Sequence, residues 1–217
     1  MNAVEPTLRS LDFASCFVYA PCGASQVAVR SRSFCAMIKA AEPALVPLYA
    51  RCVARQARLK PMLAEFFRAV DVLIPIPPCR PGWTYRERLP NRLADALVAE
   101  GLAASAWQSL RRIRAVPKSA TAAPGRRPTV QAHYDSLEVV PGPDLADGAH
   151  VLLIDDVVTR GRTLLAAAMR LHEAFPQARI GAFALVRTRG FTGDLDRLLE
   201  PCVGRIGWRA GEAHRNP

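Results

Sequence analysis

Continuous aliphatic runs along the chain predict strands that are buried on both faces. The clearest runs cover 70–77 (VDVLIPIP), 150–155 (HVLLID) and 179–188 (RIGAFALVRT). Each has the length of a strand rather than of a helix. Shorter segments of strand character lie at 16–20, 109–115 and 134–140.

Between these runs, apolar residues recur at helical spacing. The predicted helices cover 25–41, 42–69, 86–100 and 163–175. Ser25 has the character of an N-cap, and Gly101 is a natural stop for the helix before it. Pro47 and Pro61 divide the second helical segment into two or three shorter helices.

The alternation of strands and helices predicts an α/β protein with a mostly parallel twisted sheet flanked by helices. We divide the chain into a helical segment (1–69), a core (70–190) and a tail (191–217), and expect one integrated domain. Several prolines and few large apolar residues predict a long loop over 116–132. Such a loop is either a functional lid or unstructured.

Composition narrows the class of protein. Half of the 217 residues are hydrophobic, which is enough for a substantial core. No apolar run is long enough to cross a bilayer and the N-terminus has no signal-peptide pattern, so we expect a cytoplasmic protein with no membrane partner. The six cysteines form no C-x-x-C pair, which argues against a zinc ribbon.

The basic charge suggests an anionic partner without identifying it. The formal net charge is +10, and only Lys39, Lys60 and Lys118 of the 29 basic residues are lysines. Arginine binds phosphates and carboxylates in bidentate fashion, so a polyphosphate or a nucleic acid is a candidate ligand. The alternative is a compositional bias, because the arginines are scattered and not gathered on one helix face.

The strongest chemical signal follows the strand at 150–155. Asp155 and Asp156 end the aliphatic run, and Thr159-Arg160-Gly161-Arg162-Thr163 then leads into the helix at 163–175. A helix N-terminus offers free N–H groups to a phosphate, while two carboxylates accept hydrogen bonds from vicinal hydroxyls or orient magnesium-bound water. A ribose 5-phosphate meets both requirements.

The stretch 151–163 reads as four hydrophobic residues, Asp-Asp, two hydrophobic residues and Thr-x-Gly-x-Thr. It resembles the phosphoribosyl pyrophosphate signature of type I phosphoribosyltransferases. The resemblance implies that fold, with a variable hood and a flexible loop. It also implies that Asp155 and Asp156 orient the ribose and Mg²⁺, through water or ligand, while residues 159–163 bind the 5′-phosphate. The alternative is an ordinary strand–turn–helix with a solvated aspartate pair.

Two further segments resemble the ComF-like branch of this family, which is associated with competence for DNA uptake. The first is the strand at 70–77 with its proline-rich exit and YRERLPNRLADAL; it implies a pyrophosphate loop at Pro78, Cys79 and Arg80. The second is the loop at 116–132, where a hood would close over pyrophosphate. Lys118, Arg126 and Arg127 are its cations. The alternatives are a strand exit shaped by sterics alone and a solvated basic loop.

The resemblance covers 70–190 and is weaker before residue 70. The four-cysteine zinc module of many ComF-like proteins has no counterpart here, and TYRERLPNR replaces the usual Gly-Phe-Asn run. Both departures leave the substrate and any link to DNA uptake open.

The expected activity is transfer of a phosphoribosyl group to a nitrogen nucleophile with Mg²⁺. The alternatives are a regulator that binds phosphoribosyl pyrophosphate or a nucleotide without turnover, and a DNA-uptake accessory protein that binds single-stranded DNA. The acceptor base is not readable, and a homodimer is left open. Tyr19 is a candidate for stacking or a core residue, and His133 a candidate general base or, as we favour, a surface histidine.

Overall fold

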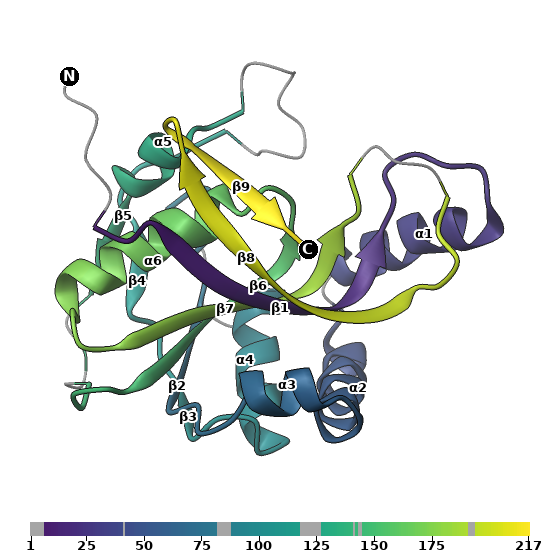
Figure 1. Cartoon of the computed structure of the whole chain (residues 1–217), viewed down its shortest axis with the longest axis horizontal. Coiled ribbons are helices and arrows are strands. Elements are labelled where there is room, and N and C mark those ends of the chain that lie inside the picture. The colour runs from purple at the N-terminus through teal and green to yellow at the C-terminus, as the bar shows by residue number, and fades with distance from the viewer. Residues whose placement is uncertain are drawn as a thin grey trace.

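Within the residues that the structure describes, seven strands pair into one twisted sheet in the order β3-β2-β6-β7-β1-β8-β9 (Figure 1). The structure is a computed structural model that describes residues 7–40, 42–81, 88–117, 127–140, 142, 145–190 and 194–217. The strands are β1 (Ser10–Tyr19), β2 (Val72–Pro75), β3 (Ser105–Ala106), β6 (His150–Val158), β7 (Arg179–Thr188), β8 (Leu199–Arg209) and β9 (Glu212–Asn216).

The sheet is mostly parallel, as the sequence predicted. Strands β3, β2, β6, β7 and β1 run parallel to one another, and only β8 and β9 pair in the antiparallel sense. A separate antiparallel pair joins β4 (Leu110–Arg112) to β5 (Leu137–Val139). The α/β class with a mostly parallel sheet flanked by helices is therefore confirmed.

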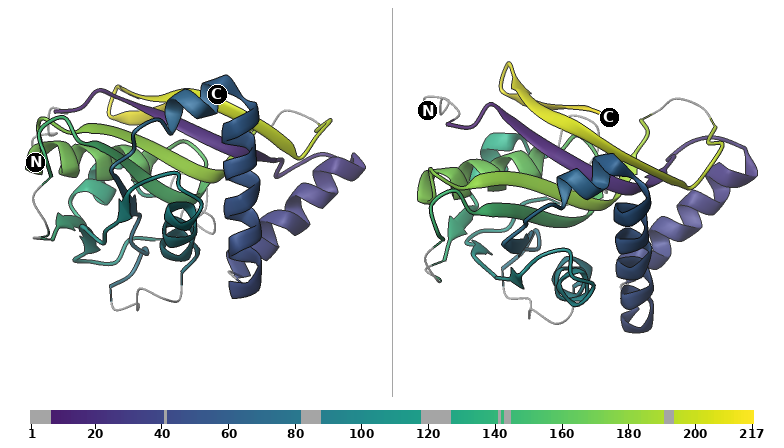
Figure 2. Two further views of the ribbon diagram at one scale, coloured as in Figure 1. Left: turned by 90° about the horizontal axis from the view of Figure 1, so that it is seen from below. Right: turned by 60° about the horizontal axis from the view of Figure 1, so that its bottom comes forward.

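Helices cover both faces of the sheet (Figure 2). They are α1 (Gln26–Ala40), α2 (Val46–Leu59), α3 (Pro61–Phe66), α4 (Leu89–Ala99), α5 (Val130–Tyr134) and α6 (Arg162–Ala174), with a 3₁₀ turn at Pro43–Leu45. Helices α5 and α6 pack on one face together with β4 and β5, and α2, α3 and α4 pack on the other.

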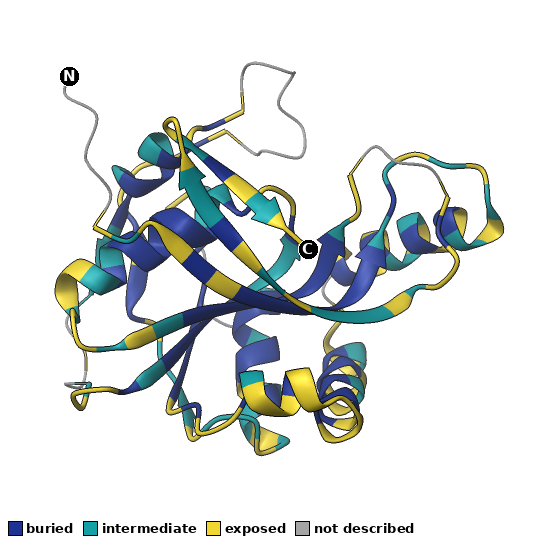
Figure 3. Ribbon diagram, viewed as in Figure 1, coloured by how far each residue is buried: buried dark blue, intermediate teal, exposed yellow. Residues whose placement is uncertain are grey.

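The central strands carry the core because their side chains alternate between the two layers. Val151 and Leu153 face α6, whereas Leu152 and Ile154 face the α2–α4 layer. All four are buried, and Figure 3 shows the same dark blue along the middle of the sheet. A strand buried on both faces has no polar side, which explains the unbroken aliphatic runs.

The helix boundaries follow local signals in the sequence. Ser25 Oγ accepts a hydrogen bond from the Ala28 N–H at 3.1 Å and so caps α1 as predicted. Gly101 has a φ of 76° just after α4, and the Leu102 N–H donates to Leu97 O at 3.0 Å. This left-handed residue stops the helix at the predicted point.

The two ends of the chain depart most from the expected organisation. Residues 1–69, expected to be helical with a short strand, contain the long strand β1, which lies between β7 and β8. The tail at 191–217, for which no element was predicted, forms the β8–β9 hairpin. Residues from all three predicted segments therefore share one sheet. No helix in the described part of the chain is long and apolar enough to cross a membrane.

Candidate functional site

The predicted motif lies where two neighbouring strands lead to opposite faces of the sheet. Strands β2 and β6 pair in parallel, with Pro75 beside Ile154, and the Ile76 N–H donates to Ile154 O at 2.8 Å. The chain after β2 leads to α4 on one face, and the chain after β6 leads to α6 on the other. Open α/β sheets bind ligands in the crevice that such a divergence leaves. The fold thus brings the exit of β2 and the motif together.

The aspartate pair lies within β6, near its end, and not just after it, because the strand continues to Val158. By alternation, Asp155 continues the face of Leu153, and Asp156 that of Ile154. Each carboxylate accepts the next backbone N–H through its Oδ1: Asp156 N–H to Asp155 at 2.9 Å and Val157 N–H to Asp156 at 2.8 Å. A hydrogen bond between the two side chains also links Asp155 to Asp156, so the pair forms one connected unit at the end of the strand.

Burial and repulsion favour the protonated, neutral form of Asp155. Desolvation raises the pKa of Asp155 well above its ordinary value, the neighbouring Asp156 raises it further, and Arg88 opposes the rise. A pair of adjacent carboxylates at a partly buried strand end is costly for the fold. A ligand that brings hydroxyl donors or a cation to this position offsets the cost.

Gly161 is the N-cap of α6, and its conformation is one that only glycine adopts easily. Its φ is 82°, and a Cβ added there would lie 2.5 Å from Ile206 Cδ1. Gly161 has no side chain to cap the helix, so the first N–H groups of α6 lack the usual side-chain acceptor. The turn therefore leaves backbone N–H groups at the start of α6 without a side-chain acceptor, and their binding of a phosphate stays a prediction.

The remaining residues of the motif divide into exposed and engaged ones. Thr159 and Arg160 are exposed to solvent. The guanidinium of Arg162 is hydrogen-bonded within the protein. Its Nε donates to Glu212 Oε2 at 2.6 Å and its Nη1 donates to Pro128 O at 3.2 Å. Thr163 is half-buried, with its Oγ1 3.4 Å from Nε2 of His133.

The exit of β2, which was predicted to hold pyrophosphate, is held by hydrogen bonds from β4 and the residues that follow it. Arg112 Nε donates to Pro78 O at 3.0 Å, and the Val116 N–H donates to Cys79 O at 2.8 Å. Pro78 and Cys79 are half-buried, whereas Arg80 is exposed. With both carbonyl oxygens held by the chain, this turn has a defined shape next to the aspartates.

Two arginines near Asp155 were missed as site residues in the sequence analysis. Arg112 is buried, and its pKa is lowered to about 10, chiefly by desolvation and also by Arg88, against the opposing effects of Cys79 and Asp155. Nη1 of Arg88, the residue before α4, is buried and has no hydrogen-bond partner among the described residues. The alternation of Leu110 and Arg112 on one face of a strand was a signal for the first arginine. No pattern distinguished the second.

His133 is not the surface histidine that we favoured, because it is buried beneath α6. Desolvation, together with the charges of Arg112 and Arg162, lowers its pKa to about 4. Its Nδ1 has no partner among the described residues. The position was mistaken because α5 packs against α6, which follows it about 30 residues later in the chain, and the local sequence does not encode this contact.

Helix α1 borders the aspartates from the other face. Burial raises the pKa of the Cys35 thiol; Lys39 lowers it and Asp156 raises it, so Cys35 and Asp156 are neighbours. Helices α1 and α2 lie side by side (Figure 2), with the rings of Phe34 and Tyr49 5.8 Å apart. Tyr19 ends β1 nearby and packs partly into the same core, so stacking on a ligand stays an untested prediction.

The predicted hood cations are only partly visible. Lys118 and Arg126 lie outside the described residues, and Arg127 is exposed. Their role in holding pyrophosphate therefore stays a prediction.

The aspartate pair has the right chemistry for Mg²⁺ but is not a complete metal site. Among the described residues, no group of three or more His, Cys, Asp or Glu side chains is arranged to hold a metal ion. Carboxylate oxygens suit Mg²⁺, which keeps several waters and often takes phosphate oxygens as further ligands. Asp155 and Asp156 fit a magnesium ion that arrives with a phosphorylated ligand.

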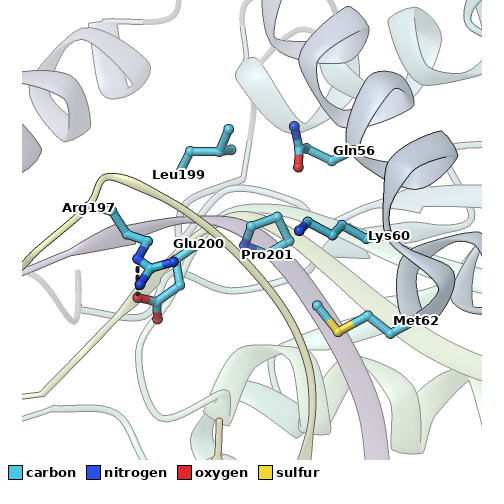
Figure 4. Close-up of a pocket in the computed structure, with 7 residues that line it drawn as sticks. All are labelled: Gln56, Lys60, Met62, Arg197, Leu199, Glu200 and Pro201. Carbon is cyan, nitrogen blue, oxygen red and sulfur yellow. Dashed lines mark ion pairs between the residues drawn. The ribbon is translucent and has the colours of Figure 1, made fainter.

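A separate pocket opens between α2, α3 and the start of β8 (Figure 4). It encloses about 310 Å³ and is lined by Gln56, Lys60, Met62, Arg197, Leu199, Glu200 and Pro201. It shares no residue with the predicted motif, so it does not bear on the site at β2 and β6. Comparison with known proteins gives no match to a protein-family model and no significant match to a curated protein.

Proposed function

We propose that the protein binds phosphoribosyl pyrophosphate, or a nucleoside 5′-phosphate, at the exits of β2 and β6. We further propose that it transfers the phosphoribosyl group to a nitrogen nucleophile, as type I phosphoribosyltransferases do. The observation that carries the proposal is the Asp155–Asp156 pair near the end of β6, followed by the left-handed Gly161 at the start of α6, at the divergence of β2 and β6. The resemblance of 151–163 to the family signature supports the same ligand.

In this mechanism, Asp155 and Asp156 accept hydrogen bonds from the two ribose hydroxyls, and the turn at 159–163 binds the 5′-phosphate through N–H groups and threonine hydroxyls. Pro78, Cys79 and Arg80, with Lys118, hold the pyrophosphate. The buried charges of Arg88 and Arg112 add positive potential behind it. Bound Mg²⁺ supplies neutralising charge to the pyrophosphate.

Catalysis would come from positioning and electrostatics. The bond between C1′ and the pyrophosphate oxygen breaks, the oxygen keeps the electron pair, the nitrogen lone pair forms the new bond to C1′, and the proton of the attacking N–H passes to the solvent. The residues around C1′ hold the sugar still and surround the departing group with positive charge. Raising the pKa of Asp155 costs stability in the free protein, and ribose hydroxyl donors recover it in the complex.

The test is to incubate the protein with phosphoribosyl pyrophosphate, Mg²⁺ and a panel of nucleobases, and to measure pyrophosphate release. We expect release with at least one base and a loss of about 100-fold or more in kcat/KM for Asp155→Asn. The matched control is Asp147→Asn, which removes an exposed carboxylate in the turn before the same strand. Asp147→Asn should leave both binding and release unchanged.

Stability separates loss of function from loss of fold. Asp155→Asn removes a buried repulsion, so we expect its free energy of unfolding at pH 7 to rise by about 1 kcal/mol while activity falls. Binding of phosphoribosyl pyrophosphate without release for every base would favour a non-catalytic regulator. An absence of binding to the wild-type protein would refute the proposal.

A further inference from the structure

The β8–β9 hairpin contacts the turn after β6 at several points. This turn, residues 159–163, is called the phosphate loop below. The hairpin is the yellow segment of Figure 1, and its second strand ends at the C-terminus of the chain. Ile206 on β8 fills the space next to Gly161, and Glu212 on β9 pairs with Arg162 at 2.6 Å. These contacts join parts of the chain that are about 50 residues apart.

The third contact, from Arg215, ties together the ends of two parallel strands. Its Nε donates to Thr159 O, just after β6, at 2.6 Å, and its Nη2 donates to Thr188 O at the end of β7. The guanidinium lies over the ring of Phe13, 5.5 Å from its centroid. Arg215 is partly withdrawn from water, and desolvation lowers its pKa. A bidentate guanidinium can hold two carbonyl groups at a fixed separation, which a single ammonium group does less well.

The hydrogen bond to Thr159 O has a consequence for the phosphate loop. In a trans peptide, the C=O and the following N–H point in opposite directions. Holding Thr159 O towards Arg215 therefore turns the Arg160 N–H away from the hairpin. Arg160 itself is exposed, so an anion can reach this part of the loop from the solvent.

Charge on the loop is also set by the hairpin. Arg162 donates hydrogen bonds to Glu212 and to Pro128 O, and the carboxylate of Glu212 balances much of its positive charge. Arg215 has no carboxylate partner among the described residues: it contacts two carbonyl oxygens and an aromatic ring, and its Nη1 is buried without a hydrogen-bond partner there. Arg215 therefore places an uncompensated positive charge beneath the loop.

We propose that the β8–β9 hairpin is part of the ligand site and that Arg215 is a positioning residue for the 5′-phosphate. It orients the Arg160 N–H and supplies a buried positive charge under the phosphate loop. This inference rests on the proposed function, because it takes the ligand of the loop to be a sugar phosphate. It assigns a specific role to the C-terminal hairpin, which otherwise only extends the sheet.

Arg205 provides a matched control on the same hairpin. It lies on β8, opposite Asn216 of β9, and its Nε pairs with Asp12 at 2.8 Å in an exposed ion pair. Arg205→Ala removes the same charge and a hydrogen bond without touching the phosphate loop. A general effect of losing an arginine from the hairpin would appear in both variants.

The experiment compares wild-type protein, Arg215→Ala, Arg215→Lys and Arg205→Ala by calorimetric titration with ribose 5-phosphate and, separately, with pyrophosphate. Arg215→Ala should raise the Kd for ribose 5-phosphate about tenfold and leave the Kd for pyrophosphate unchanged. Arg215→Lys keeps the charge but not the paired donors, so its Kd for ribose 5-phosphate should lie between those of the wild type and Arg215→Ala. Arg205→Ala should bind both ligands like the wild type.

Equal weakening of both ligands in Arg215→Ala, or no weakening of either, would overturn the proposal. If Arg215→Ala does not fold, the same criteria apply to Arg215→Lys. Failure of the proposed function is distinguishable, because the wild-type protein would then bind neither ligand. In that case amide hydrogen exchange decides: exchange at 159–163 faster in Arg215→Ala than in Arg205→Ala supports positioning by Arg215, and equal exchange refutes it.

Discussion

At the scale of single residues, the site is built from groups whose charge is shifted by burial. Asp155 is pushed towards its neutral form by desolvation and Asp156, and Arg112 is buried with its Nε on Pro78 O. His133 lies beside Thr163 and is held neutral by desolvation and by the nearby arginines. Groups perturbed in this way cluster at functional sites more often than elsewhere.

His133 makes a pH-dependent contribution that is measurable without any ligand. Its pKa falls from the ordinary 6.5 to about 4 in the folded protein, so between these values the unfolded chain binds the proton more readily. The contribution of His133 to the free energy of unfolding is fully present above pH 6.5. It decreases by about 3 kcal/mol as the pH falls to 4, and it does not change further at lower pH. Urea unfolding of wild-type protein and His133→Gln from pH 7 to pH 4 checks this.

The His133→Gln variant should lose less stability than the wild type across that window. Parallel curves for the two proteins would show that the imidazole is protonated as easily in the folded state as in the unfolded one. NMR titration of the His133 ring protons gives the folded-state pKa directly.

At the scale of elements, the turn between β6 and α6 depends on an element distant in sequence. Gly161 needs its left-handed φ of 82° to begin α6, and Ile206 of β8 occupies the space that a side chain would need. The same turn carries the hydrogen bond from Arg215 to Thr159 O. The hairpin therefore shapes both the backbone and the packing of the phosphate loop.

A pair of glycine variants separates backbone strain from steric clash. Gly148 also has a positive φ of 76°, but a Cβ there meets nothing within 4 Å. We expect Gly148→Ala to reduce the free energy of unfolding by about 1 kcal/mol and Gly161→Ala by about 3 kcal/mol. Chemical unfolding of both variants gives the comparison.

The clash has its own control in a double-mutant cycle. Ile206→Ala opens the space beside Gly161, so the double variant should be less destabilised than the sum of the two single variants. Strict additivity would mean that Ile206 does not limit the substitution.

At the scale of the whole molecule, one sheet joins the beginning, middle and end of the chain. Strand β1 lies between β7 and β8, with Asp12 beside Gly181 on one side and Arg205 on the other. Ile206 of β8 and Ala213 of β9 are both buried in the core on the α6 face. The hairpin is thus a structural part of the sheet as well as a neighbour of the site.

Shortening the chain tests this integration. Removal of 199–217 leaves β1 as an exposed edge and takes Ile206 out of the core, so we expect most of the stability of roughly 5–15 kcal/mol typical of a domain to be lost. Removal of 210–217 alone keeps β8 and should leave a cooperative but less stable fold. Thermal unfolding followed by circular dichroism checks both variants. A cooperative transition at the wild-type temperature for the chain without 199–217 would contradict the expectation.

The sequence by itself determined the elements whose signals are local. The aliphatic runs gave β2, β6 and β7, with β7 at its predicted bounds, and the Ser25 cap and the Gly101 stop fixed helix ends. The aspartate pair and the glycine of the phosphate loop were also readable, because a strand, a turn and a helix in succession place them at one end of β6. Hydrophobic periodicity and capping act over a few residues, so a single segment contains them.

Only the tertiary structure decided the contacts between distant segments. It placed β1 inside the sheet, buried His133, held Pro78 with Arg112, and brought Arg215 to Thr159. The β8–β9 hairpin escaped prediction because nearly all of β8 is only half-buried or exposed and its burial shows no clean alternation. Its strands are stabilised by pairing with β1 and with each other, and that pairing energy depends on partners almost 200 residues away in the chain rather than on the residues themselves.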